Sequence, residues 1–245
     1  MKPLIIAHRG ASAHAPENTM AAFDLAIRQK ADGIEFDVWK CGSGEIVVTH
    51  NRQTQALSGT AGDLQTMTLK QLRKLDFGRH KDPKFRGERI PTLDEVLDLA
   101  HGLELINIEI KGTELRSRGI ELDVAEKILR HKLLRRVVVS SFNPTILARL
   151  QDLNPAIRIG LLLYEKSPMP LRRGWSAKLL KPFSIHPSFA LLKKKFVELA
   201  HRKDQKVIVW TINDSAQLET CIQDGVDAMI TDDPAWMYDA LHNAP

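Results

Sequence analysis

Short runs of valine, isoleucine and leucine alternate with amphipathic segments along the whole chain. Short apolar runs bounded by turn residues are typical of buried strands, and apolar positions three or four residues apart are typical of helices. The runs predict strands over residues 4–8, 33–39, 105–111, 136–142, 157–163, 183–186, 207–212 and 228–231. The segments between them predict helices over residues 19–30, 93–101, 120–131, 144–153, 189–202, 215–224 and 234–241.

Eight apolar strands that alternate with helices predict a parallel sheet with both faces covered. Eight is also the number of strands that closes a (β/α)8 TIM barrel, for which a length of about 250 residues is typical. The chain has 245 residues. We therefore expect one α/β domain over residues 1–245, folded as such a barrel.

One interval breaks this alternation. A second short apolar run, residues 45–50, follows the strand over residues 33–39, and about forty residues then precede the helix at residue 93. A long excursion from a compact domain is usually an inserted lid or small subdomain. Because it leaves the carboxyl end of a strand, where the active sites of barrels lie, residues 51–90 are expected to form an inserted subdomain beside the site.

The charge balance favours anionic partners without pointing to nucleic acid. The 35 Lys and Arg residues against 30 Asp and Glu residues give a formal net charge of +5. Mild basicity suits anionic ligands, phosphate esters among them. The basic clusters at residues 130–136, 172–173 and 193–195 are better explained as solvated helix faces or ends, since no aromatic residues are interleaved for stacking on bases.

The cysteine content and the apolar segments predict a cytoplasmic protein. Cys41 and Cys221 cannot build a disulfide framework and have no metal-type spacing, which is typical of a reducing compartment. The apolar stretch at the N-terminus is too short for a signal peptide, and no run approaches the roughly 18 apolar residues of a membrane span. No stable association with a membrane is expected, and the oligomeric state is left open.

Two predicted strands carry carboxylates on one face. Side chains alternate across a strand, so Glu35 and Asp37 face the same way in residues 33–39. In residues 105–111, Asn107, Glu109 and Lys111 also share a face. Carboxylates inside a barrel repel one another, and a hard divalent cation such as Mg²⁺, Ca²⁺ or Mn²⁺ would remove that repulsion. Salt-bridged carboxylates at strand ends are the alternative, with Lys111 neutralising Glu109.

Two histidines end apolar runs. His8 and Arg9 follow the first strand, and His50 ends the extra run over residues 45–50. Polar residues commonly occupy wet strand ends, but a histidine titrating near neutrality also suits proton transfer, and Arg9 suits an anion. His186, at the end of another predicted strand, is a weaker candidate for the same site.

Eight short motifs together carry a resemblance to a known family. They are AHRGA (7–11), PENT (16–19), GIEFDV (33–38), VVTH (47–50), IPTLDEVL (90–97), NIEIK (107–111), VSSFN (139–143) and VWTIN (209–213). In this order and at this spacing they resemble the glycerophosphodiester phosphodiesterases of the bacterial cytoplasmic type. The resemblance spans residue 7 to about residue 233 and ends in GVDAMITD (225–232).

The resemblance implies a (β/α)8 barrel with an insertion after its second strand and an enzyme that hydrolyses glycerophosphodiesters. The products would be glycerol 3-phosphate and an alcohol such as choline or ethanolamine. In the family the nucleophile is thought to be the 2-hydroxyl of the glycerol, giving a cyclic phosphate that water then opens.

The resemblance also implies roles for single residues. Glu35, Asp37 and Glu109 match the positions that hold one divalent cation, commonly Mg²⁺ or Ca²⁺, and His8 and His50 match the paired acid and base. Arg9 and Lys111 match positions that contact the phosphate, and Glu17 matches one that supports the site. Apart from the resemblance, Trp210 is a candidate apolar wall for the glycerol and Phe142 a weaker one, with ordinary barrel packing an equal or better explanation for both.

The segment after His50 departs from the family pattern. Asn51 stands where the family usually has Asp, Gln55 stands near the position of another Asp, and Ala56 stands where Arg is common. Asn51 can accept a hydrogen bond but cannot stabilise a protonated His50 by charge. An altered pH optimum or a lower rate is expected, and the alcohol specificity is left open.

Two other functions remain as alternatives. A lysophospholipase D on the same scaffold would need an apolar entrance for an acyl chain, whereas the insertion is polar. A catalytically weak phosphodiester-binding barrel is suggested by Asn51 and Ala56, although all three carboxylates and both histidines are present. A nucleic-acid phosphodiesterase is supported only by the net charge.

Overall fold

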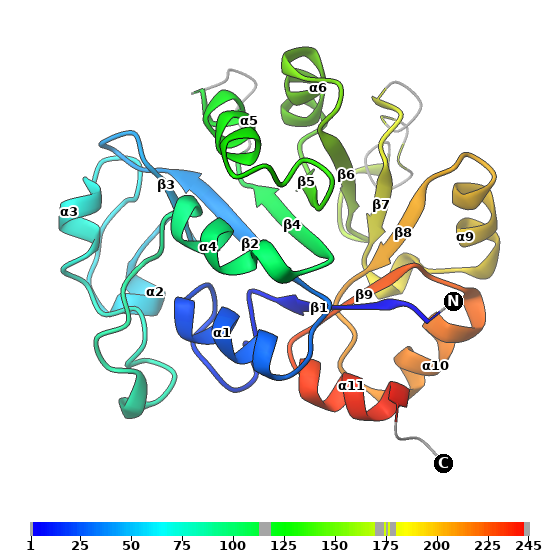
Figure 1. Cartoon of the computed structure of the whole chain (residues 1–245), viewed down its shortest axis with the longest axis horizontal. Helices are drawn as coiled ribbons and strands as arrows, with labels where there is room; N and C mark the ends of the chain where they lie inside the picture. The colour runs from blue at the N-terminus through cyan, green and yellow to red at the C-terminus, as the bar shows by residue number, and fades with distance from the viewer. Residues whose placement is uncertain (1, 113–118, 170–173, 175, 177–179, 243–245) are drawn as a thin grey trace.

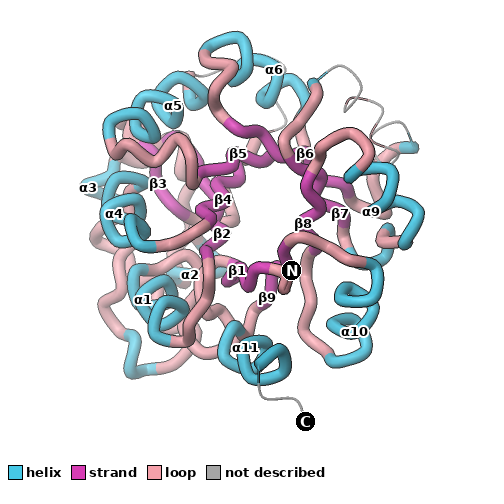
Figure 2. The backbone as a smooth tube through the Cα atoms, turned by 45° about the vertical axis from the view of Figure 1, so that its right-hand side comes forward, coloured by secondary structure: helices cyan, strands magenta, loops and turns pink. Residues whose placement is uncertain are grey.

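A computed structural model describes residues 2–112, 119–169, 174, 176 and 180–242, and its strands close into a parallel barrel (Figures 1 and 2). The ring runs in the order β1-β9-β8-β7-β6-β5-β4-β2 and closes where β1 pairs with β2. Its strands are β1 (Leu4–His8), β2 (Gly33–Lys40), β4 (Leu105–Ile110), β5 (Val137–Ser141), β6 (Arg158–Leu163), β7 (Ser184–Pro187), β8 (Lys206–Val209) and β9 (Ala228–Thr231). The predicted (β/α)8 barrel is confirmed.

Helices surround the barrel, as Figure 2 shows. They are α1 (Met20–Arg28), α4 (Leu93–Leu99), α5 (Ile120–Arg130), α6 (Pro144–Leu153), α9 (Lys194–His201), α10 (Ser215–Asp224) and α11 (Pro234–His242). Short 3-10 turns η2 (Ala100–Gly102) and η3 (Phe189–Leu191) adjoin α4 and α9. None of the helices formed by the described residues is long and apolar enough to cross a membrane.

The alternation of side chains along β2 separates the packing layer from the site. Ile34, Phe36 and Val38 are fully buried in the core between the strands and the helices. Glu35 and Asp37, between them, therefore face the barrel interior. Gly33 at the start of β2 allows the neighbouring strand to approach, since a Cβ there would lie 2.2 Å from the Leu105 carbonyl oxygen.

The outer layer depends on aromatic packing between α1 and β2. The rings of Phe23 and Phe36 meet edge to face with their centroids 5.6 Å apart, and both side chains are fully buried. Replacing Phe23 with alanine is expected to lower the free energy of unfolding by about 3–5 kcal/mol, because it leaves a cavity. Urea denaturation measures this, with Leu122→Ala on the exposed face of α5 as a control expected to cost about 0.5 kcal/mol or less. Equal losses of unfolding free energy in the two variants would contradict the placing of Phe23 in the packed layer between α1 and β2.

The barrel interior is apolar at one end and polar at the other. Near the amino ends of the strands, an apolar cluster fills it, formed by Ile6, Leu105, Val138, Ile208, Ala228 and Ile230. Toward the carboxyl ends, the inward positions of β1, β2 and β4 carry His8, Glu35, Asp37 and Glu109. The functional groups therefore collect where barrels place their active sites.

The excursion after β2 forms a small body beside the barrel (Figure 1). It begins with β3 (Ile46–Val48), which pairs antiparallel with β2 outside the ring. It continues through α2 (Gln55–Ser58), α3 (Leu69–Leu72) and the 3-10 turn η1 (Pro83–Phe85). A separate core holds these segments, made by Cys41, Val47, Leu57, Leu64, Leu72, Phe77 and Ile90. The Lys81 ammonium group donates to the Ser12 carbonyl at 2.7 Å, which ties this body to the loop after β1.

Some element bounds differ from those predicted. The single helix expected over residues 189–202 is divided, because Leu192 and Lys193 are extended between η3 and α9. The Phe189 amide donates to the Trp210 carbonyl at 2.8 Å, which holds this segment against the end of β8 before the helix can begin. The short run over residues 45–50 is a strand only as far as Val48, and the strand expected over residues 207–212 ends at Val209. The basic pair at 172–173 lies outside the described residues.

Candidate active site

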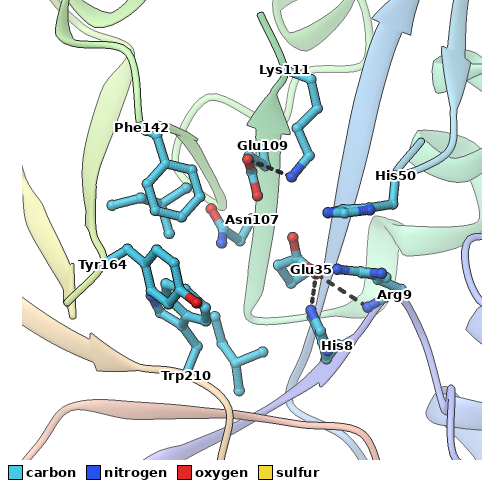
Figure 3. Close-up of a pocket in the computed structure, with 12 residues that line it drawn as sticks. His8, Arg9, Glu35, His50, Asn107, Glu109, Lys111, Phe142, Tyr164 and Trp210 are labelled. Carbon is cyan, nitrogen blue, oxygen red and sulfur yellow. Dashed lines mark hydrogen bonds and ion pairs between the residues drawn. The ribbon is translucent and has the colours of Figure 1, made fainter. Parts of the chain in front are cut away.

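A cavity of about 390 Å³ opens at the carboxyl end of the barrel (Figure 3). Its two sides differ in chemistry. One side is charged and consists of His8, Arg9, Glu35, His50, Glu109 and Lys111. The other is mostly apolar and consists of Asn107, Phe142, Leu162, Tyr164, Trp210 and Ile230. The cavity can therefore hold a ligand that is anionic at one end and carbon-rich at the other.

Three carboxylates converge on the charged side. Asp37 and Glu109 are direct neighbours across β2 and β4, and Glu35 lies two residues earlier on β2. All three side chains are buried, and one oxygen atom of each lies within 4.8 Å of the others. The spacing in the sequence produces this cluster because the parallel register brings the inward positions of both strands to one level.

The charges around these carboxylates do not balance them. Lys111 Nζ lies 2.9 Å from Asp37 Oδ1 and 2.7 Å from Glu109 Oε1, and Arg9 Nε lies 3.4 Å from Asp37 Oδ2. Burial opposes ionisation of Asp37, but Lys111 and Arg9 outweigh it and hold the Asp37 pKa well below its usual value. Burial, reinforced by the charge of Asp37, raises the pKa of both Glu35 and Glu109. Ionisation of all three carboxyl groups at once is therefore unfavourable in this cluster, and a bound cation would relieve that cost.

The donor set fits a hard divalent ion. Every ligand atom in the cluster is a carboxylate oxygen, the donor that Mg²⁺, Ca²⁺ and Mn²⁺ favour. Asn18 fixes one of these ligands, since its amide donates to Asp37 Oδ2 at 2.9 Å. The predicted residues can therefore hold the predicted class of metal.

Arg9 is held at the edge of the cavity by the turn that follows β1. Its backbone is left-handed, with φ of 55°, and its amide donates to the Glu35 carbonyl at 2.8 Å. Its guanidinium donates to Glu17 Oε1 at 3.0 Å. Glu17 therefore touches Arg9 and orients it, while the guanidinium faces the cavity.

His8 has a carboxylate partner that the sequence did not reveal. Its Nδ1 lies 2.6 Å from Asp232 Oδ1, and Asp232 is itself held by Ser12 at 3.1 Å and Asn213 at 2.6 Å. Burial lowers the pKa of His8, but the hydrogen bond that His8 donates to Asp232 and the charge of Glu35 outweigh it, so the net change is upward. The available signal was the position of Asp232, directly after the last strand.

His50 has a neutral partner. Its Nδ1 lies 3.0 Å from Asn51 Oδ1, and its carbonyl accepts a hydrogen bond from the Trp39 indole at 3.1 Å. Burial, followed by the opposing effects of Asp37 and Lys111, leaves the pKa of His50 below its usual value. In both histidines the Nδ1 atom is occupied, so Nε2 is the nitrogen available to a ligand.

Three aromatic rings form the wall opposite the carboxylates (Figure 3). The Trp210 ring centroid lies 5.7 Å from that of Phe142 and 5.8 Å from that of Tyr164. The Trp210 indole donates to the His186 carbonyl at 2.8 Å, which fixes its orientation. Trp210 and Phe142 were candidates from the sequence, whereas Tyr164 was missed, although it directly follows the strand over residues 158–163.

His186 does not line the cavity. It is fully buried inside the barrel, with Nε2 2.7 Å from Ser184 Oγ, and burial lowers its pKa to about 3. A strand-end histidine was a reasonable candidate for the site, but its Cα is paired with that of Leu162 and its side chain is directed toward Ser184 and Gly160. Its neutral imidazole belongs to the barrel packing.

Comparison with known proteins identifies the family. Residues 8–236 match the Glycerophosphoryl diester phosphodiesterase family. The chain is 38% identical over 239 residues to a glycerophosphodiester phosphodiesterase of Caldanaerobacter subterraneus subsp. tengcongensis, with 96% of each chain covered. An Oleispira antarctica phosphodiesterase, solved in complex with the product sn-glycerol-3-phosphate, superimposes with a TM-score of 0.83 at 28% identity, covering 97% of this chain and 96% of that one.

A second solved structure, of a putative glycerophosphodiester phosphodiesterase from Galdieria sulphuraria, superimposes with a TM-score of 0.87 at 27% identity, covering 98% of both chains. The chain therefore belongs to the glycerophosphoryl diester phosphodiesterase family, and both the resemblance and the enzyme class expected from the sequence are confirmed.

Proposed function

We propose that this chain hydrolyses glycerophosphodiesters to glycerol 3-phosphate and an alcohol with the help of one divalent cation and the pair His8 and His50. The observation that carries the proposal is the cavity itself. Two carboxylates, two histidines and two cationic side chains line one volume of about 390 Å³, and the buried carboxylate of Asp37 lies within 4.8 Å of the two that line it. Figure 3 shows the side chains of Glu35, Glu109, the two histidines, Arg9 and Lys111 gathered on one side of this cavity.

Glu35, Asp37 and Glu109 would hold the cation, either Mg²⁺ or Ca²⁺, with Mn²⁺ also suitable. When bound, such an ion acts as a Lewis acid that lowers the cost of charge on the phosphate oxygens. Two side chains of the protein supply further positive charge. Arg9 and Lys111 line the same side of the cavity and would bind the phosphodiester anion, whose own charge otherwise repels a nucleophile.

The two histidines would carry the proton transfers. Asp232 can only accept, so the Nδ1 atom of His8 carries the proton of their hydrogen bond and leaves Nε2 toward the cavity. Asn51 Oδ1 has the same effect on His50. One imidazole would deprotonate the attacking 2-hydroxyl of the glycerol as its new P–O bond forms, and the other would protonate the alkoxide whose P–O bond breaks. Water would then open the cyclic phosphate to give glycerol 3-phosphate. The net shifts in pKa keep His8 protonated to higher pH and His50 neutral to lower pH, which are the protonation states that an acid and a base need at the start of the reaction.

The aromatic side of the cavity would accept the carbon skeleton of the glycerol. Phe142, Tyr164 and Trp210 offer apolar faces opposite the charged side. The complex of the Oleispira antarctica relative with sn-glycerol-3-phosphate supports a glycerol phosphate ligand for this chain. The glycerol 3-phosphate half of the substrate would then fill the cavity, and the alcohol would leave toward its opening.

The test is product identification with the purified enzyme. Glycerophosphocholine and glycerophosphoethanolamine are expected to release glycerol 3-phosphate when Mg²⁺, Ca²⁺ or Mn²⁺ is present. Turnover of lysophosphatidylcholine together with vesicle binding would instead identify a lysophospholipase D. Absence of turnover with every glycerophosphodiester, by a folded protein supplied with each metal, would identify a binding barrel.

The neutral partner of His50 gives a prediction about pH dependence. Changing Asn51 to Asp places a carboxylate where an amide oxygen now lies 3.0 Å from Nδ1. Because an adjacent negative charge favours the imidazolium, the pKa of His50 is expected to rise. The acidic limb of the pH profile of kcat/KM, where the base His50 loses its proton, would therefore move to higher pH. With Asn51→Ala as the uncharged control, equal profiles for the two variants would contradict this role.

A further inference from the structure

Asn107 is a buried polar side chain without a partner in the cavity. It is 1% exposed, and neither its Nδ2 nor its Oδ1 has a hydrogen-bond partner among the described residues. An unsatisfied buried amide is unfavourable, because its desolvation is not compensated. Ser140 Oγ and His186 Nδ1 share this condition, but neither residue lines the cavity, whereas Asn107 does.

The position of Asn107 is set by the register of the barrel. Its Cα is paired with that of Glu35 on β2 and with that of Val138 on β5, and it lies two residues before Glu109 on the same face of β4. In Figure 3 its amide is directed into the space between Glu35 and the rings of Phe142 and Tyr164. Asn107 therefore stands at the boundary between the charged and the aromatic sides.

The chemistry of the amide selects among the parts of the substrate. A phosphate group offers only acceptors and would leave Oδ1 unpaired. It is also better bound by Arg9 and Lys111 on the charged side. A hydroxyl group can both donate to Oδ1 and accept from Nδ2, so a polyol next to the phosphate satisfies both atoms.

We propose that Asn107 determines specificity by binding the terminal hydroxyl of the glycerol moiety. This inference rests on the proposed function and names the residue that recognises a free, unacylated glycerol. An acyl ester at that oxygen has no proton to give to Oδ1, and the added chain would need space beside Asn107, whose side chain is buried. The same residue therefore disfavours lysophospholipids, because a site built to pair with a hydroxyl strongly rejects a ligand that lacks it.

The test compares two substrates and two enzymes. The substrates are glycerophosphocholine and its analogue with the terminal glycerol hydroxyl replaced by hydrogen. The wild type is expected to prefer glycerophosphocholine by about 10²-fold in kcat/KM. Asn107→Leu, which keeps the approximate volume and removes both polar atoms, is expected to lose about 10²-fold on glycerophosphocholine and less than about threefold on the analogue, so that the preference disappears.

Ser140→Ala is the matched control. Ser140 lies on the next strand and has a fully buried hydroxyl with no hydrogen-bond partner in the described part of the chain, but it does not line the cavity. It is expected to keep the wild-type preference between the two substrates. Loss of the preference in Ser140→Ala as well would show that general disturbance of the barrel interior removes it, and would overturn the proposal.

Two further outcomes separate this inference from the proposed function. If the wild type hydrolyses glycerophosphocholine and Asn107→Leu retains the preference between the substrates, the inference fails and the proposed function stands. If the wild type hydrolyses neither substrate, the proposed function itself fails. A Mn²⁺ titration gives an independent readout. A fall of tenfold or more in Mn²⁺ affinity in Asn107→Leu would show that Asn107 acts through the carboxylates, and would also overturn the proposal.

Discussion

Replacing Glu109 with glutamine is expected to lower kcat/KM for glycerophosphocholine by about 10³-fold or more. The amide preserves the shape of the side chain but removes one of three carboxylates whose oxygen atoms lie within 4.8 Å of one another. If these groups hold the cation, its loss removes several kcal/mol of stabilisation of the transition state, and each 1.36 kcal/mol corresponds to a tenfold change in rate. Steady-state kinetics at saturating Mg²⁺ measures the effect.

The same variant should also differ from the wild type in metal requirement. A higher Mg²⁺ concentration for half-maximal activity is expected in Glu109→Gln, since the remaining ligands bind the ion less tightly. Glu198→Gln is the matched control, because Glu198 is an exposed carboxylate on α9. Glu109→Gln with activity within tenfold of the wild type and an unchanged Mg²⁺ requirement would show that Glu109 only neutralises Lys111.

Removal of the His8 imidazole is the second large expected effect. His8→Ala should lower kcat for glycerophosphocholine by about 10³-fold, within the range usual for a lost general acid or base. The pairing of Nδ1 with Asp232 at 2.6 Å favours the protonated imidazole, so we expect His8 to protonate the leaving alkoxide. A substrate with p-nitrophenol as leaving group needs no such proton, and on it His8→Ala should lose less than about tenfold.

Two variants make this result specific. His50→Ala is expected to be equally impaired on both substrates, because a general base is needed whatever the leaving group. His14→Ala is the control, since His14 pairs with Asp233 at 3.0 Å and does not line the cavity. Equal losses on the two substrates in His8→Ala would reassign His8 as the base.

Much of this architecture could be predicted because it follows from local periodicity. The alternation along residues 33–38 and 105–110 fixes which side chains face the interior, and the carboxyl ends of parallel strands meet at one end of a barrel. The convergence of Glu35, Asp37 and Glu109 needed no further information. The neighbouring residues His8 and Arg9 reach the same cavity for the same reason, at the end of β1.

What could not be predicted depends on closure of the barrel. His8 and Asp232 are 224 residues apart in sequence and meet only because β1 pairs with β9. Tyr164 contributes to the aromatic wall through the direction of the chain after β6, which no periodic pattern fixes. The helix expected over residues 189–202 is divided into η3 and α9 because the Phe189 amide donates a hydrogen bond at the end of β8. This contact joins parts of the chain that are distant in sequence.

We propose that one divalent ion held by the three carboxylates is required for hydrolysis of glycerophosphodiesters. The most direct measurement titrates chelator-treated enzyme with Mn²⁺ and follows bound metal and release of glycerol 3-phosphate from glycerophosphocholine in the same samples. Activity is expected to rise in proportion to bound metal and to saturate at about one ion per chain, and Glu35→Gln is expected to shift both curves together. Full activity in the metal-free enzyme, or metal binding that is unchanged in Glu35→Gln, would contradict the proposal.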